Sequence, residues 1–78
     1  MYLIGPNARP VKTSEEIGAL LRKKRKSQAL TQAQVAEHCG VSPRFVSEVE
    51  RGKASAEIGK VLYLLEMLGV DLIADTRD

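Results

Sequence analysis

The chain has 78 residues, of which 44% are hydrophobic and 28% charged, and its formal net charge is +2. This length allows one small domain that buries only about 60% of its unfolded surface, so a partner subunit would stabilise it. The composition excludes a disordered chain, and no apolar run reaches the roughly 18 residues that span a bilayer. Because the only cysteine, Cys39, excludes an internal disulfide, a reducing, cytoplasmic location is expected.

The first twelve residues contain one glycine and two prolines, which indicates an arm, with a short strand at MYLI. A first helix is predicted from Thr13 or Ser14 to about Ser27, because Thr13 and Glu16 form a capping box. Its apolar stripe comprises Ile17, Leu20 and Leu21. The helix also carries RKKRK, residues 22–26, which holds five of the twelve Lys and Arg residues. This uneven charge favours a polyanionic partner.

Two short helices follow in TQAQVAEHCGVSPRFVSEVERGK, residues 31–53. Thr31 begins the first with a second capping box, and Gly40 ends it. Ser42 caps the next helix, which has Pro43 at its first position and stops at Gly52. The inward-facing residues are Val35, Ala36, Cys39, Val46 and Val49.

A fourth helix is predicted from about Ser55 to Leu68, ending at Gly69, and the run VDLIAD, residues 70–75, predicts a short strand. The core stripe of the helix is assigned to Ile58, Val61, Leu62, Leu65 and Leu68. The helix carries a second apolar set, Tyr63, Leu64 and Met67, and the strand has no obvious partner within the chain. Both features suggest a two-fold dimer that joins the fourth helices and pairs the strands across subunits. The predicted interface residues are Tyr63, Leu64, Met67, Leu72 and Ile73. The chain is thus divided into an arm (1–12), a helical domain (13–69) and a dimerising strand and tail (70–78).

A helix, a glycine-containing turn and a second helix at this spacing are typical of the DNA-binding helix-turn-helix, whose second helix enters the major groove. Side chains that point away from the core can there bind base edges: arginine binds guanine, and glutamate accepts from cytosine N4. The candidate base-reading residues are Ser42, Arg44, Phe45, Ser47 and Glu48. Two alternatives stay open, because an outward arginine is often only solvated and a phenylalanine is often half-buried against a neighbouring helix.

Arg25 and Glu50 continue the core faces of their helices, so we expect them to form one partly buried ion pair. Other basic residues, either solvated or in contact with DNA phosphates, are Arg22, Lys23, Lys26 and Lys53. His38 and Cys39 lie on different faces of one short helix, so a nucleophilic pair is not expected. The sequence contains no set of residues at metal-ligand spacing and no phosphate-binding glycine loop, so no metal, cofactor or enzymatic activity is predicted.

The stretch LRKKRKSQALTQAQVAEHCGVSPRFVSEVERGK, residues 21–53, resembles the Cro/repressor-type (xenobiotic-response-element family) helix-turn-helix. The shared features are the L-T-Q opening, G-V-S in the turn and E-R-G-K at the close. The run AEIGKVLYLLEMLGVDL, residues 56–72, is similar to the HipB-type antitoxin branch. The family usually has glycine before L-T-Q where this chain has Ala29. A left-handed alanine there would cost about 1 to 2 kcal/mol. The turn between the first and second helices can therefore differ in detail from that of the family.

The resemblance implies an all-α, lambda-repressor-like bundle of four to five helices whose C-terminal strand pairs across a homodimer. It implies a repressor of a toxin–antitoxin operon that binds palindromic double-stranded DNA and neutralises a HipA-like serine/threonine kinase. It also places Gln32 against the DNA backbone or an outer base, and a buried pair at Arg25 and Glu50. The alternatives are a stand-alone or phage-type regulator without a toxin, and a protein–protein adaptor that uses the same fold.

Overall fold

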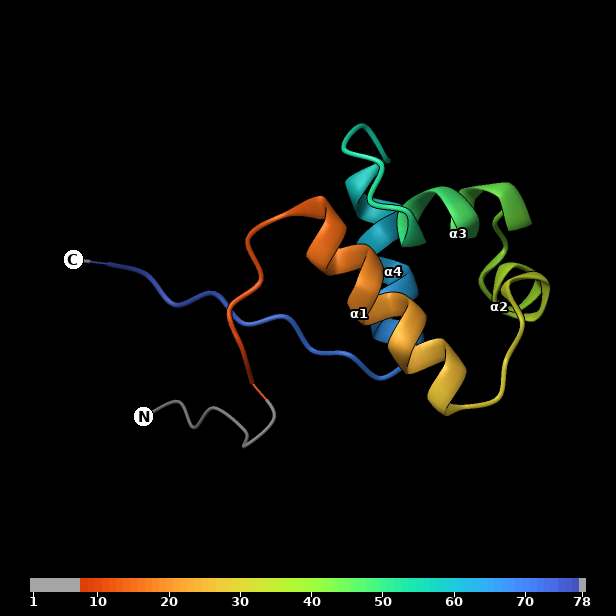
Figure 1. The fold of residues 1–78 in the computed structure, drawn as a ribbon, viewed down its shortest axis with the longest axis horizontal. Helices are drawn as coiled ribbons and strands as arrows, with labels where there is room; N and C mark the ends of the chain where they lie inside the picture. Colours follow the sequence, from red (N-terminus) through yellow and green to blue (C-terminus); the bar gives the residue numbers. More distant parts are fainter. Residues whose placement is uncertain (1–7, 78) are drawn as a thin grey trace.

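The computed structural model describes residues 8–77, which form a bundle of four helices (Figure 1). The helices are α1 (Ser14–Ser27), α2 (Gln32–Cys39), α3 (Pro43–Glu50) and α4 (Ile58–Met67). The segments before α1 and after α4 leave the bundle on the side away from α2 (Figure 1). The all-α class and the four predicted helices are therefore confirmed.

Three of the four helices begin at the predicted caps, whereas α4, predicted from about Ser55, begins at Ile58 with the Glu57 carboxylate accepting the N–H groups of Gly59 and Lys60. The Thr13 hydroxyl accepts the backbone N–H of Glu16 at 3.0 Å, and the carboxylate of Glu16 accepts the N–H of Lys12 rather than that of Thr13. Thr31 and Gln34 make the full reciprocal capping box. Because each cap satisfies backbone N–H groups that have no partner within the helix, the short sequence signals are sufficient to set the helix starts.

All four helices end in the same way, with a left-handed residue followed by a backbone hydrogen bond from the next residue to a carbonyl five positions earlier. The left-handed residues are Ala29, Gly40, Gly52 and Gly69. The closing bonds are Leu30 to Arg25, Val41 to Ala36, Lys53 to Glu48 and Val70 to Leu65, at 2.8 to 3.2 Å. This is the Schellman motif, which satisfies the carbonyl groups that a helix end leaves free.

Ala29 has φ of +58°, so this chain keeps a left-handed turn without the glycine that such a turn favours. We expect Ala29→Gly to raise the free energy of unfolding by about 1 kcal/mol. The strain of a left-handed alanine, about 1 to 2 kcal/mol, exceeds the extra chain entropy that glycine loses on folding. Urea denaturation of the two chains measures the difference. A less stable glycine variant would contradict the prediction.

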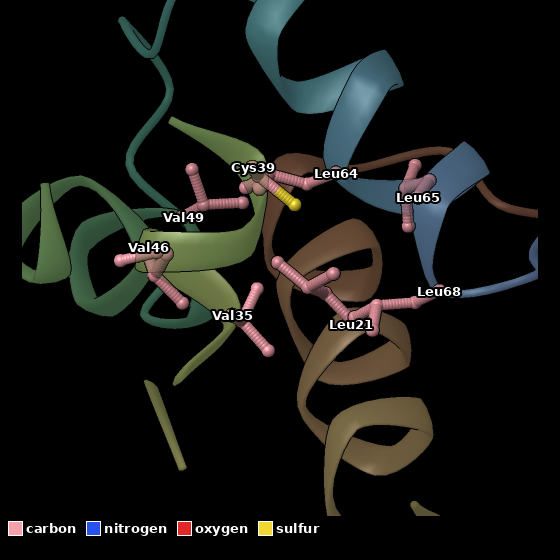
Figure 2. Close-up of a cluster of buried hydrophobic side chains, with 9 residues drawn as sticks. Leu21, Val35, Cys39, Val46, Val49, Leu64, Leu65 and Leu68 are labelled. Carbon is pink, nitrogen blue, oxygen red and sulfur yellow. The ribbon is translucent and has the colours of Figure 1, made fainter. Parts of the chain in front are cut away.

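The core lies between the four helices (Figure 2). Its largest fully buried side chains are Leu21, Leu64, Leu65, Val35 and Val46. Gly18 brings α1 against the end of α3, since a Cβ atom at this position would meet the carbonyl oxygens of Val49 and Glu50. This close approach was not predicted from the sequence, although it sets the distance between α1 and α3.

The predicted core face of α4 was right for Val61, Leu65 and Leu68 and wrong for Ile58 and Leu62. Leu64, assigned to the dimer interface, is fully buried in the core of its own chain, whereas Ile58 and Leu62, assigned to the core, are 71% and 46% exposed. The core face of the helix thus adds Leu64 to the predicted Leu65 and Leu68, with Val61 partly buried. Residues 61–68 are apolar at seven of eight positions, so more than one stripe satisfies helical periodicity.

Residues 70–77 are assigned to no strand, and none is assigned anywhere in residues 8–77. A lone strand is not stable without a neighbour, so the pairing of residues 70–75 across a dimer stays a prediction. The other predicted strand, MYLI, lies outside the described residues. No helix within the described range is long and apolar enough to cross a membrane.

Candidate nucleic-acid interface

The turn between α2 and α3 fixes the direction in which α3 leaves the bundle. Gly40 adopts φ of +69°, and the Ser42 hydroxyl accepts the backbone N–H of Phe45 at 3.0 Å. Val46 and Val49 are buried, so the opposite side of α3 faces solvent. The first turn of α3 is therefore a rigid platform for the outward side chains.

Arg44 points into solvent, with 85% of its side chain exposed. Ser42 is exposed and Ser47 is half-buried. Phe45 is half-buried and packs against the core, and the Lys60 ammonium lies 5.9 Å from the centre of its ring. These contacts favour the alternative in which Phe45 is half-buried against neighbouring residues, because the ring already interacts with the core and with the Lys60 ammonium.

Glu48 makes contacts within the protein. Its Oε2 atom lies 3.2 Å from the Lys53 ammonium and 3.6 Å from Nε of Arg44, and only 20% of the side chain is exposed. The hydrogen bond from Lys53 lowers the pKa of Glu48, so the carboxylate is charged at neutral pH. The structure thus brings together three residues that the sequence analysis had assigned separately to bases and to the DNA backbone.

A second network joins α1, α2 and α3. Arg25 donates from Nε and Nη2 to the two carboxylate oxygens of Glu50 at 2.7 and 3.0 Å, and from Nη1 to the Leu30 carbonyl at 2.7 Å. The predicted ion pair is present, and only 10% and 2% of the two side chains are exposed. Gln32 donates from Nε2 to Glu50 at 3.0 Å. Since a carboxylate only accepts, this contact fixes which way the amide of Gln32 points.

The electrostatic effects within this network oppose one another. Burial disfavours the charged form of Glu50, but the hydrogen bonds from Arg25 and Gln32 outweigh burial and hold the pKa of Glu50 below its ordinary value. The same pairing raises the pKa of Arg25. Both groups are therefore charged at neutral pH. The pair holds the end of α1 against the end of α3, and Gln32 joins the start of α2 to the same carboxylate.

The outward basic residues of α1, namely Arg22, Lys23 and Lys26, are exposed as predicted. Their exposure fits both a solvated face and contact with phosphates. Burial raises the pKa of the Cys39 thiol, which keeps it in the unreactive protonated form. In the described part of the chain, no three His, Cys, Asp or Glu side chains are grouped to hold a metal ion.

Sequence reasoning missed three contacts that hold this surface in place. Gly18 allows α1 to approach α3, and Gln28 donates from Nε2 to the Leu68 carbonyl at 2.8 Å, which ties the turn after α1 to the end of α4. Ser14 donates to the Gly52 carbonyl at 2.9 Å. No local pattern marks these residues, because each contact joins segments more than 30 positions apart.

Comparisons with known proteins agree with this geometry. The sequence model of a helix-turn-helix domain family matches residues 16–78. The chain is 46% identical over 69 residues to an uncharacterized HTH-type transcriptional regulator, y4mF, of Sinorhizobium fredii; the match covers 86% of this chain and 91% of that protein.

Solved structures with the same fold include two complexes of HipB. A HipB–O2 20mer complex has a TM-score of 0.81 at 14% identity and covers 92% of this chain and 100% of that one. A HipA–HipB–O2–O3 complex has a TM-score of 0.79 at 15% identity and covers 90% and 100% of the two chains. The family match over most of the sequence and the identity to y4mF show that the chain belongs to the helix-turn-helix family of transcriptional regulators.

Proposed function

We propose that the chain is a sequence-specific DNA-binding repressor whose α3 helix enters the major groove. The observation that carries the proposal is the position of Arg44, on the first turn of a capped helix with 85% of its side chain exposed. A guanidinium in this place can donate to both O6 and N7 of guanine. Ser42 and Ser47 complete the base-reading set, and the basic residues of α1 supply phosphate contacts, which add affinity without sequence information.

Arg44→Ala is expected to weaken operator binding by about 1 to 3 kcal/mol and to relax the preference at one base position in each half-site. Selection of bound sequences from random double-stranded DNA, followed by titration of the selected sites, measures both effects. Lys26→Ala is the matched control, since loss of a phosphate contact weakens all sequences alike and flattens the salt dependence. If Arg44→Ala reduces binding to selected and random DNA equally, Arg44 contacts only phosphate.

Gln32 is proposed to contact the DNA backbone from the start of α2. Its Nε2 atom is bound to Glu50, so the amide is held in one orientation before DNA arrives. A side chain that is already ordered loses less conformational entropy on binding.

The active form is proposed to be a homodimer on an inverted-repeat operator. Support comes from the apolar side chains that remain exposed on α4 and after it, namely Ile58, Leu62, Tyr63, Met67, Leu72 and Ile73. Several large apolar side chains exposed on one helix and the segment after it favour a protein–protein contact. A two-fold dimer would present two copies of α3 to successive turns of the major groove.

The finer proposal is that the repressor is also the antitoxin of a HipBA-type operon and neutralises a HipA-like serine/threonine kinase. It is supported by the HipB-like run in residues 56–72 and by the shared fold with HipB, which has been solved together with HipA. We expect the purified chain to inhibit phosphorylation by a HipA-like kinase encoded beside it. If no such kinase gene is adjacent, or if the kinase stays active in the presence of the chain, the stand-alone regulator is the correct description.

A further inference from the structure

The residue that follows the left-handed turn differs at one of the four helix ends. After α1, α2 and α4 this residue is Leu30, Val41 or Val70, and each packs against the core. A hydrophobic contact here is the usual companion of the Schellman motif. After α3 the residue is Lys53, which is exposed. The exception occurs at the helix that carries the candidate base-reading residues.

The backbone of this turn places Lys53 beside Glu48. The N–H of Lys53 donates to the Glu48 carbonyl at 3.1 Å, and Gly52 supplies the left-handed conformation with φ of +84°. The two side chains then meet, with the ammonium 3.2 Å from Oε2 of Glu48. The ion pair therefore takes the place of the apolar contact found at the other three helix ends.

Lys53 and Arg44 compete for one oxygen atom. Oε2 of Glu48 accepts a hydrogen bond from Lys53, whereas Nε of Arg44 is 3.6 Å away, too far for one. A carboxylate and a guanidinium can form two parallel hydrogen bonds. Without Lys53, Glu48 would bind Arg44 in this way or would turn to the bases, where it accepts from cytosine N4.

We propose that Lys53 is a specificity-determining residue of the DNA-binding surface, because it holds the Glu48 carboxylate away from the bases and leaves the Arg44 guanidinium free to bind guanine. The inference rests on the proposed DNA-binding function. It replaces two roles assigned from the sequence, a phosphate contact for Lys53 and a base contact for Glu48. An exposed pair of this kind contributes little to stability, so its effect should be seen in binding and not in folding.

The test compares the wild type with Lys53→Met in selection from random double-stranded DNA, scored at the base position that Arg44→Ala relaxes. We expect the preference for guanine at this position to fall about tenfold in Lys53→Met, with little change in the thermal unfolding midpoint. Adding Glu48→Gln should restore the preference, since a neutral amide competes weakly for Arg44. Arg51→Met removes one exposed positive charge two positions before Lys53, and it should leave all base preferences intact.

Equal weakening of all sequences by Lys53→Met and Arg51→Met would overturn the inference and make Lys53 a phosphate contact. Failure of Glu48→Gln to restore the guanine preference would also overturn it, because the effect of Lys53 would then not pass through Glu48. A wild-type chain that selects no sequence would overturn the proposed function, and this inference with it.

Discussion

Replacing Glu50 by alanine is expected to lower the free energy of unfolding by about 3 to 5 kcal/mol. The substitution leaves the guanidinium of Arg25, whose side chain is 10% exposed, with the Leu30 carbonyl as its remaining partner. It also removes the acceptor for the Gln32 amide. For a domain of this size, whose stability rests on a small core, a loss of this magnitude is a large part of the total. Urea denaturation followed by circular dichroism measures the change.

The matched control replaces both partners, Arg25→Leu with Glu50→Leu. This variant should lose much less stability than Glu50→Ala, because no charge is left buried without a partner. A double-mutant cycle that uses alanine at each position should show strong coupling, and two additive losses would contradict the assignment of the pair.

The same pair gives a pH dependence with a definite sign. The pKa of Glu50 is lower in the folded chain than in the unfolded chain. Its stabilising contribution is therefore present at neutral pH and is lost as the pH falls through the folded-state pKa. The difference in stability between wild type and Glu50→Ala should accordingly shrink in acid.

The features that the sequence predicted correctly are those that depend on near neighbours. Thr13, Thr31 and Ser42 were identified as caps because a hydroxyl at these positions bonds to an N–H group three residues later. The pairing of Arg25 with Glu50 was predicted because each residue continues an apolar stripe by one helical turn. Such signals are local or periodic, so they can be read without knowledge of the packing.

The features that the sequence did not predict depend on packing between distant segments. α4 is apolar on several sides, and the choice of Leu64 over Leu62 for the core depends on how the other helices meet it. The sequence predicted that α3 stops at Gly52. It did not show that the turn after this glycine brings the side chain of Lys53 against that of Glu48. The starts that carry a hydroxyl cap were therefore predictable, whereas the start of α4, which Glu57 caps, and the face that α4 buries were not.

Placing a charge on the exposed apolar surface of α4 and the following segment is expected to dissociate the proposed dimer. The surface contains Leu62, Tyr63 and Met67 of α4, with Leu72 and Ile73 after it, each 38 to 46% exposed. An aspartate there would have to be desolvated in the dimer, and this costs more than the apolar contact contributes. Two variants test the two parts of the surface separately: Tyr63→Asp on α4, and Leu72→Asp with Ile73→Asp in the segment predicted to pair across subunits.

Dissociation should weaken binding to an inverted repeat by about 100-fold or more, since the second α3 helix would no longer be held at high effective concentration. The half-sites of that repeat are expected about 34 Å apart, one turn of DNA or a multiple of it. Sedimentation at micromolar concentration measures the oligomeric state of each variant. The control is Ala19→Asp, an apolar-to-acidic change at an exposed position of α1. If the wild type is monomeric, or if both variants dimerise as well as the control, this interface is wrong. If only one variant dissociates, the interface is confined to the part of the surface that this variant changes.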